Sequence, residues 1–333
     1  MKFGFVDTCL KHDPGRRHPE NPDRIRAIRR RLQTEADVEY SKTDPATREQ
    51  LLTVHSNDYL TELQEFCEEG GGNWDADTIA TEETWDAALA SAGLGIWAAK
   101  TALHDPADEN IPFSLGRPPG HHATEGDAMG FCFFNNIAIA TEAILETVDR
   151  VAIFDWDVHH GNGTQEIFYD RSDVFYASIH EEGLYPGTGD IHETGESDGI
   201  GTTLNAPVPA GVGDGEYTFL FDEIIKPAIL RFEPNVLLIS AGFDAHRHDP
   251  ISRTHVSTEG FGHLAARIRD IVAEHEIRLG FILEGGYSLD TLAESVVMVN
   301  DVFTGTTPTI DKSDPDQQTQ ELVATLRDVH SLG

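Results

Sequence analysis

Short apolar runs alternate with longer helical patterns along the 333 residues of the chain. Runs rich in β-branched and aromatic residues predict strands, namely Phe3–Val6, Ile111–Leu115, Val151–Phe154, Val174–Ile179, Val236–Ser240 and Leu279–Leu283. Apolar residues at helical spacing predict the longer elements, namely Glu83–Leu103, Asn136–Val148, Glu216–Arg231 and Thr258–Glu274. This alternation favours an α/β fold in which helices cover a mostly parallel sheet.

Polar residues mark where some of these elements begin and end. Asn57 and Thr258 each stand just before an apolar helical pattern, so both are interpreted as helix-capping side chains. Residues 305–318 are rich in Thr, Pro and Asp and resemble a linker, which leads to a terminal helix near Thr319–His330. Because no internal repeat or second-domain pattern is present, we expect a single domain over residues 1–333.

The chain is strongly acidic, with a formal net charge of −34. A protein that binds the phosphate backbone of nucleic acids needs a basic face, so this charge argues against direct nucleic-acid binding. A dense acidic surface repels itself in dilute buffer and is screened at high salt, which suggests a halophilic protein from a salt-rich cytoplasm. An acidic surface that serves solubility alone is the alternative.

Other features of the sequence point to a soluble cytoplasmic protein. Cys9, Cys67 and Cys132 are too few and too scattered for a disulfide framework or a cysteine-based zinc site. The N-terminus is charged too early for a secretory signal, and no apolar run reaches the length of a membrane span. The sequence does not indicate an oligomeric state.

The most informative segment is residues 155–160, Asp-Trp-Asp-Val-His-His, which directly follows a predicted strand. The period of two in an extended chain sends the side chains of Asp155, Asp157 and His159 to the same side. Two carboxylates and an imidazole are costly to bury without a cation, and this donor set suits a divalent ion such as zinc. A polar turn after a core strand is the alternative for this segment alone.

Three other predicted strands also run directly into unusual polar sequence. These segments are Gly116-Arg117-Pro118-Pro119-Gly120-His121-His122, Ala241-Gly242-Phe243-Asp244 and Glu284-Gly285-Gly286-Tyr287. Ligands of open α/β sheets bind outside the carboxyl ends of the strands, so all four segments are expected to converge on one site.

The converging residues could assemble a catalytic metal site. Asp157, His159 and Asp244 would supply three ligands and leave one position open for water or substrate. His121 and His122 could take a proton from the attacking water and return it to a leaving amine.

Tyr287, flanked by glycines, could donate a hydrogen bond to the developing oxyanion. Together these groups describe metal-assisted amide hydrolysis. Taken singly, a His pair in a Pro-Gly loop is often structural, a Gly-Gly-Tyr segment is usually a turn, and Asp244 could cap a helix.

With these motifs in place, the sequence resembles the zinc-dependent histone deacetylases and their prokaryotic relatives, including acetoin-utilisation proteins and acetylpolyamine amidohydrolases. The matching segments follow in family order between residues 15–24 and 284–287, and they include Arg117–Ala123, Gly130–Cys132, Asp155–Gln165, Tyr185–Asp190 and Ser240–Asp244. The resemblance implies the arginase/deacetylase fold, with three layers and a sheet of about eight strands. It also implies removal of acetyl groups from acetyl-lysine or from a small acylated amine.

The resemblance also assigns roles to individual residues. It implies one zinc ion per chain, held by Asp157, His159 and Asp244. His122 would be the general base and acid, His121 its electrostatic partner, and Tyr287 would polarise the acyl carbonyl. Asp155 would accept a hydrogen bond from His121, and Asn162 would sit beside His122, where Asn is typical of the class II branch. Because a neutral partner stabilises an imidazolium less than a carboxylate does, His122 should be the more easily deprotonated histidine.

Further matches concern the substrate. Phe131 and Tyr185 resemble the aromatic walls of the acyl-lysine tunnel, and the carbonyl of Gly130 resembles the acceptor for the substrate amide. Asp77 resembles the rim aspartate that holds a peptide backbone, with a solvated acid as the alternative. Arg24 resembles the arginine of the channel behind the metal, or it pairs with an acid at a helix start.

The resemblance extends to potassium ions. A first site next to the zinc would involve Asp155, Asp157, His159, Ser178 and Ile179. A second site would use the carbonyls of Phe168, Arg171 and Val174. No spacing rule predicts these sites independently of the resemblance.

The segment after Asp244 departs from the family pattern. Ile251 stands where the acetylpolyamine-selective branch carries a glutamate, so an apolar residue there favours acetyl-lysine in protein or a small acylated amine over an acetylpolyamine. An acetylpolyamine amidohydrolase is the alternative, because a glutamate elsewhere could substitute. The extra histidines His246 and His248 are interpreted as solvated loop residues rather than metal ligands.

Two rival functions fit the sequence less well than deacetylation. A two-manganese ureohydrolase on the same fold needs further Asp and His ligands in the first loop, and Arg117–His122 does not supply them. A catalytically inactive acyl-lysine binding module would need neither Tyr287 nor an intact His121-His122 pair.

Overall fold

The computed structural model describes residues 1–36, 38–104, 110–309 and 315–332. Among these residues, an eight-stranded sheet forms the centre of the molecule, and each neighbouring pair of its strands is parallel. In spatial order its strands are β2 (Tyr40–Ser41), β1 (Lys2–Gly4), β5 (Pro112–Ser114), β10 (Arg278–Leu283), β9 (Val236–Ala241), β6 (Val151–Asp155), β7 (Val174–Glu181) and β8 (Thr203–Val208).

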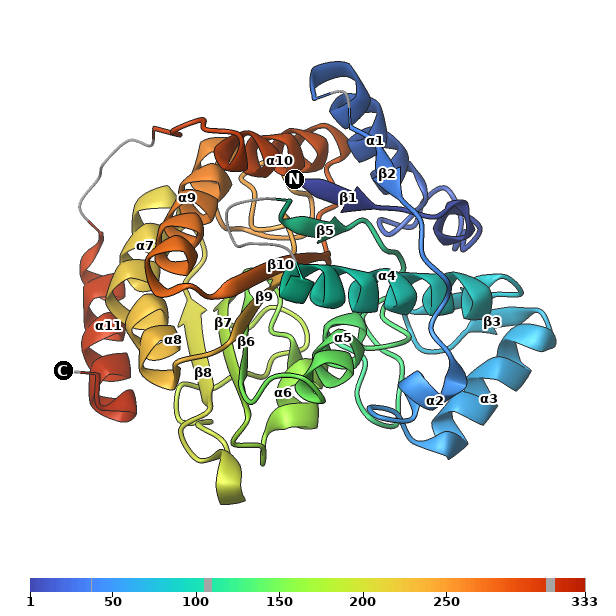
Figure 1. The fold of residues 1–333 in the computed structure, drawn as a ribbon, viewed down its shortest axis with the longest axis horizontal. Coiled ribbons are helices and arrows are strands. Elements are labelled where there is room, and N and C mark those ends of the chain that lie inside the picture. The colour runs from blue at the N-terminus through green and yellow to red at the C-terminus, as the bar shows by residue number, and fades with distance from the viewer. Residues whose placement is uncertain (37, 105–109, 310–314, 333) are drawn as a thin grey trace.

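Helices cover both faces of this sheet, which gives three layers (Figure 1). The strand β6 shows why, because alternate residues of a strand face opposite sides. Ala152 and Phe154 belong to the apolar core that α1 and α7 to α11 share, whereas Val151 and Ile153 belong to the core that α3, α4 and α5 share. A sheet buried on both faces needs the continuous apolar strands that the sequence contains.

The helices connect consecutive strands or flank the sheet. Their bounds are α1 (Asp23–Glu35), α2 (Arg48–Leu51), α3 (Asn57–Glu68), α4 (Thr84–His104), α5 (Asn136–Leu145), α6 (Asn162–Phe168), α7 (Asp214–Leu220), α8 (Lys226–Phe232), α9 (Thr258–His275), α10 (Leu289–Phe303) and α11 (Gln317–His330). Short 3₁₀ turns occur at η1 (Asp7–Leu10) and η2 (Ser197–Gly199), and a π-helical turn at η3 (Phe221–Ile225).

The predicted α/β fold with about eight strands is confirmed, but the sequence pattern missed several strands. The edge strand β8 contains Asn205 and Pro207, which obscure a strand pattern, although an edge strand tolerates proline. The other edge strand, β2, has only two residues. The hairpin of β3 (Gly71–Asn73) with β4 (Ile79–Thr81) was also missed, because its first strand is mostly glycine.

One predicted helix proved to be composite. The pattern over Glu216–Arg231 corresponds to α7, the π-helical turn η3 and α8 in direct succession. Pro227 lies just after the π-helical turn. A proline cannot donate to the preceding turn and its ring crowds the carbonyl four residues earlier, so the wider turn accommodates it.

Both predicted capping residues were wrong by one position. Ser56 caps α3 by accepting the N–H of Tyr59 at 3.3 Å, and Ser257 caps α9 by accepting the N–H of Gly260 at 3.0 Å. In each case the serine precedes another residue that is able to cap a helix. Apolar spacing does not distinguish two adjacent capping side chains.

The C-terminal helix begins earlier than predicted. Asp316 caps α11 by accepting the N–H of Thr319 at 2.7 Å. The helix therefore begins at Gln317, before the expected start near Thr319. Residues 310–314 of the predicted linker lie outside the described residues. Among the described helices, none is both long and apolar enough to cross a membrane.

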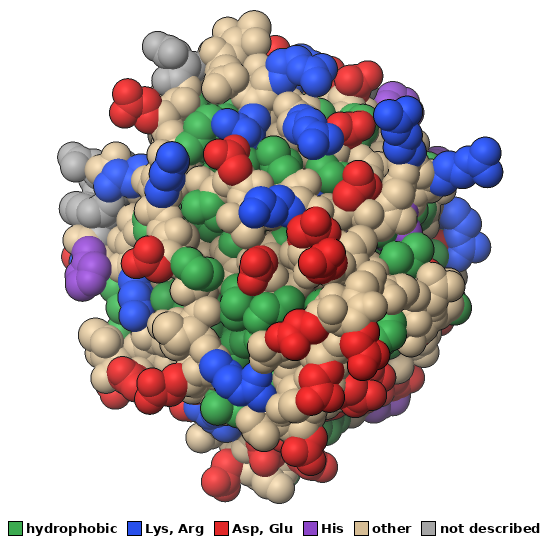
Figure 2. Space-filling model, turned by 90° about the vertical axis from the view of Figure 1, so that its right-hand side faces the viewer, with side chains coloured by type: hydrophobic (Ala, Val, Ile, Leu, Met, Phe, Trp, Pro, Cys, Tyr) green, Lys and Arg blue, Asp and Glu red, His purple; other side chains and the backbone are tan. Residues whose placement is uncertain are grey.

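The acidic composition is visible on the molecular surface. On the face drawn in Figure 2, Asp and Glu side chains form a dense group in the lower right, whereas Lys and Arg lie mostly in the upper half. The three cysteines are buried and unpaired.

Candidate active site

Four loops leave the carboxyl edge of the sheet at the same level. The strand register places Ser114, Ile282, Ser240 and Asp155 in one row across β5, β10, β9 and β6. Parallel strands that end in one row release their following loops side by side. The polar segments noted in the sequence therefore meet, although they are far apart along the chain.

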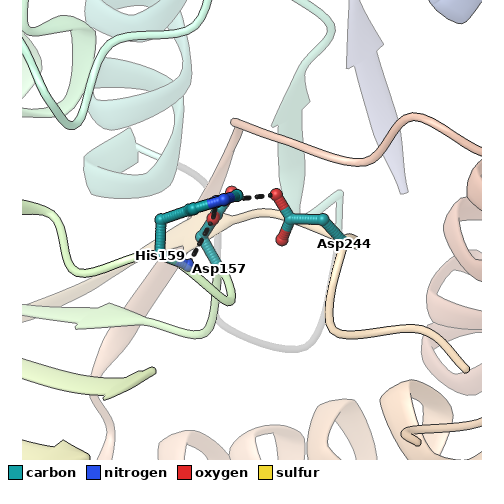
Figure 3. Close-up of side chains that lie close together, drawn as sticks. All are labelled: Asp157, His159 and Asp244. Carbon is teal, nitrogen blue, oxygen red and sulfur yellow. Dashed lines mark hydrogen bonds and ion pairs between the residues drawn. The ribbon is translucent and has the colours of Figure 1, made fainter. Parts of the chain in front are cut away.

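Asp157, His159 and Asp244 come together at this edge (Figure 3). His159 Nδ1 lies 3.0 Å from Asp157 Oδ1 and 3.1 Å from Asp244 Oδ2. Both carboxylates are completely buried. Asp157 Oδ2 accepts the N–H of Gly285 at 2.8 Å, and Asp244 Oδ1 accepts the N–H of Val158 at 2.9 Å, so the backbone fixes both side chains.

This arrangement fits a bound cation. Asp244 Oδ2 is buried and accepts no hydrogen bond from the described residues, although it lies close to the imidazole of His159. Burial disfavours charge on His159, yet Asp244 and Asp157 together raise its pKa to about 10. Two buried carboxylates thus attract positive charge to this point, and two oxygens with one imidazole nitrogen are a donor set suited to zinc.

Two glycines make room for the carboxylates. A Cβ at Gly242 would lie 1.9 Å from Asp157 Oδ2, and one at Gly285 would lie 2.2 Å from Asp244 Oδ2. Neither glycine has a positive φ, so the reason for glycine is close packing rather than backbone conformation. Any larger residue at either position would displace a carboxylate.

Asp155 does not join this cluster, which corrects the first interpretation of the segment. The strand β6 ends at Asp155, so the extended geometry assumed for residues 155–159 does not continue. Asp155 Oδ2 instead lies 2.9 Å from His121 Nδ1. The partner of Asp157 and His159 is Asp244, from the loop after β9.

The two adjacent histidines have different surroundings. Burial disfavours charge on His121, but Asp155 and Asp157 raise its pKa to about 10. Burial, followed by the neighbouring His121 and His159, holds the pKa of His122 well below its usual value. The difference has the sign expected from the sequence, with His122 the more easily deprotonated.

Asn162 orients His122. Its amide nitrogen donates to the carbonyl of His122 and contacts Met129 Sδ, so its Oδ1 faces His122 Nδ1 at 2.8 Å. His122 Nδ1 therefore carries the proton, and Nε2 is left as an acceptor.

Tyr287 lies close enough to Asp244 and Asp157 for their charges to act on its phenol. Its ring contacts Phe131, with 5.8 Å between centroids, and Arg24 stacks over it at 4.9 Å. Burial raises the pKa of the phenol well above its usual value, Arg24 opposes this, and Asp244 and Asp157 add to it. The hydroxyl is therefore protonated at neutral pH and can donate a hydrogen bond.

Arg24 is completely buried behind this group. It pairs with Glu20 at 3.2 Å and donates to the carbonyl of Gly286 at 2.6 Å. Arg24 therefore pairs with an acid, Glu20, that precedes α1. The acid in the first turn of the helix, Asp23, pairs with Arg26 instead.

The residues expected around the substrate lie near one another. The rings of His122 and Tyr185 meet edge to face at 5.2 Å, and a Cβ at Gly130 would collide with both rings. Phe131 adopts a φ of 68° and also contacts His18. Tyr185 is 36% exposed, as expected for a residue at an opening.

The other expected residues show a mixed pattern. Asp77 is exposed, and its carbonyl accepts a hydrogen bond from His18. Ile251 is half-buried. His248 is exposed, but His246 is buried with its Nε2 3.2 Å from Thr258 Oγ1, so its interpretation as a solvated residue was wrong.

The candidate potassium ligands fall into two groups. Asp155 and Ser178 are paired in the register of β6 and β7, with Ile179 next to them. Phe168 ends α6, and its carbonyl accepts the N–H of Arg171 at 3.1 Å, in the turn that leads to Val174 at the start of β7.

Sequence reasoning missed three buried acids beside the site. Glu284 accepts the N–H groups of Gly120 and His121 at 2.6 and 3.1 Å, and Glu20 binds Arg117 through both carboxylate oxygens. The third acid is Asp249. Glu284 stood in a segment already singled out, but its role depends on backbone groups that only the fold brings near.

Known proteins are similar to this chain in both sequence and fold. The family described as the histone deacetylase domain matches residues 18–303. Histone deacetylase 10, chloroplastic, of Oryza sativa subsp. japonica is 38% identical, over 95% of this chain and 78% of the relative. The histone deacetylase-like amidohydrolase of Pseudomonas aeruginosa is 40% identical, over 86% of this chain and 81% of the relative.

Solved structures agree with these relatives. The crystal structure of the HDA15 HD domain superposes with a TM-score of 0.89 and 34% identity, and the match covers 99% of this chain and 93% of that chain. The matched segment includes all four loops of the site. The chain belongs to the histone deacetylase family.

Proposed function

We propose that this protein is a zinc-dependent deacetylase that hydrolyses the amide of acetyl-lysine in a protein, or of a small acylated amine. The observation that carries the proposal is the cluster of Asp157, His159 and Asp244 facing a neutral His122 and a protonated Tyr287. A zinc ion held by the three ligands would polarise the acyl carbonyl and activate water.

The two histidines divide the proton chemistry. His122, neutral and with Nε2 free to accept, takes the proton of the attacking water and later returns it to the leaving amine. Asn162 keeps its ring in the required orientation. His121, charged through its contact with Asp155, contributes a fixed positive charge beside the developing negative charge.

Tyr287 and the aromatic residues complete the mechanism. The phenol donates a hydrogen bond to the oxygen that becomes negatively charged. This hydrogen bond strengthens as the charge develops. Phe131 and Tyr185 enclose the acyl-lysine chain, and the carbonyl of Gly130 accepts the amide N–H of the substrate. These groups bind the substrate in one orientation relative to His122.

Exchanging Asn162 for aspartate should shift the pH profile. A carboxylate 2.8 Å from His122 Nδ1 favours the imidazolium, so the pKa of His122 rises and its base form is lost at a higher pH. The acidic limb of kcat/KM should move upward by about one pH unit in N162D. An acidic limb at the wild-type pH would contradict the role of His122 as the base.

The substrate class can be tested directly. Ile251 offers no partner for a cationic polyamine, so acetyl-lysine peptides should be hydrolysed with a higher kcat/KM than acetylpolyamines. The Ile251→Glu variant should lower the ratio of kcat/KM for acetyl-lysine peptides to kcat/KM for acetylpolyamines by about tenfold, the effect of one added charge pair. Hydrolysis of neither substrate by the metal-loaded protein would overturn the proposed deacetylase function.

The acidic surface is proposed as an adaptation to a salt-rich cytoplasm, with potassium bound near Asp155 and Ser178. Screening relieves self-repulsion, so the midpoint of thermal unfolding should rise by about 5 °C or more between dilute buffer and molar KCl. NaCl at equal concentration is the control, because screening acts in both salts and potassium binding only in KCl. Equal stability in dilute buffer and molar KCl would rule out the adaptation.

A further inference from the structure

Asp249 joins two loops of the site. It lies five residues after Asp244 and is 8% exposed. Its Oδ2 accepts the N–H of Tyr287 at 2.7 Å and the N–H of Ser288 at 3.1 Å, and its Oδ1 accepts the N–H of Ile251 at 3.2 Å. One carboxylate thus connects the loop after β9 with the loop after β10.

The backbone before Tyr287 has little intrinsic rigidity. Gly285 and Gly286 precede it, and Gly286 adopts a φ of 117°. Glycine reaches many backbone conformations at low cost, so this pair alone does not fix the direction of the tyrosine. Some other contact has to hold the chain in place.

That contact comes from both ends of a single peptide unit. The carbonyl of Gly286 and the N–H of Tyr287 belong to the same peptide group. Arg24 Nε donates to this carbonyl at 2.6 Å, and Asp249 Oδ2 accepts from this N–H at 2.7 Å. Because the peptide group is planar, holding both of its ends fixes its orientation and therefore the start of the tyrosine side chain.

The same carboxylate supports the start of α10. Ser288 is the N-cap residue of this helix, and its side chain makes no capping hydrogen bond. The N–H groups at a helix start need outside acceptors, and negative charge there is favourable. Asp249 Oδ2 is such an acceptor, because it accepts the N–H of Ser288.

We propose that Asp249 is a positioning residue for Tyr287, acting through the peptide group that precedes the phenol. The inference rests on the proposed function of Tyr287 as oxyanion donor. Loss of the carboxylate frees the Gly286–Tyr287 peptide, and a misplacement of about 1 Å at a catalytic group can cost up to about 10²-fold in rate. The loss cannot exceed the contribution of the phenol itself.

A double-mutant cycle tests this coupling. With metal-loaded protein, Asp249→Ala should lower kcat by about 10- to 100-fold and change KM by less than about threefold. In the Tyr287→Phe background, the same change should have almost no further effect on kcat. If the two losses multiply in the double variant, Asp249 does not act through Tyr287 and the inference is overturned.

Two further variants separate positioning from general stability. Asp249→Asn keeps an oxygen that can accept from Tyr287, so it should recover most of the wild-type kcat. Asp316→Ala removes a carboxylate cap from α11, far from the site, and should lower stability by about 1 kcal/mol with kcat unchanged. Loss of bound metal in both Asp249 variants would instead assign the residue to the ligand loop and would overturn the inference.

The two proposals fail in different ways. If Tyr287→Phe alone retains wild-type kcat, the proposed role of the phenol fails, whatever Asp249 does. If Tyr287→Phe is slow and Asp249→Ala is as fast as the wild type, only the positioning role fails.

Discussion

Replacing Asp244 by asparagine should eliminate metal binding and lower kcat/KM by more than about 10³-fold, because the reaction loses several kcal/mol of charge stabilisation. Stability should change in the opposite direction from activity. Without metal, we expect the variant to be more stable against unfolding than the wild type. Burial and the nearby Asp157 raise the pKa of Asp244 to about 7, so its charge is unfavourable without a cation. A neutral amide removes the burial cost and the repulsion from Asp157, which together outweigh the favourable pairing with His159.

Two measurements check this expectation. Metal content per chain should fall from one ion to none, and the thermal unfolding midpoint of the chelated protein should rise. The matched control is Asp58→Asn, the same chemical change on the exposed surface of α3, which should alter neither quantity. An Asp244 variant that retains its metal and its turnover would contradict the ligand assignment.

Replacing Tyr287 by phenylalanine should lower kcat by about 10²- to 10³-fold, the usual effect of removing one oxyanion donor. KM and metal content should change little, because the phenyl ring keeps its contacts with Phe131 and Arg24. The interaction is made mainly in the transition state, so its loss appears in kcat.

The control for this variant is Tyr40→Phe, which also removes a phenol hydroxyl. Tyr40 lies on the edge strand β2, and its hydroxyl contacts the carbonyl of Arg29. Steady-state kinetics of both variants should separate a specific role from a general effect. Turnover of the Tyr287 variant at the wild-type rate would exclude the phenol as an oxyanion donor.

The interior of the fold was predictable from the sequence because its strands are continuously apolar. β6, β9 and most of β10 are buried on both faces, and such strands read as uninterrupted hydrophobic runs. The edge strand β2 has only two residues, and Asn205 and Pro207 interrupt the apolar pattern of the edge strand β8. The π-helical turn η3 was hidden because its residues continue the helical spacing.

The candidate site was predictable where side chains act through their own chemistry. Asp157, His159 and Asp244 could be grouped because ligands follow strand ends. Glu284 and Asp249 could not be assigned, because each binds backbone N–H groups of another loop, and any sequence supplies those groups. Their roles depend on the strand register and loop paths rather than on a motif.

The central claim is that deacetylation depends on a metal ion held by Asp157, His159 and Asp244. The most direct test measures acetate release from an acetyl-lysine peptide in molar KCl, alongside metal content, before chelation, after chelation and after zinc is restored. We predict one ion per chain, loss of acetate release with the ion, and recovery of both with zinc. Undiminished acetate release from protein without metal would contradict the claim.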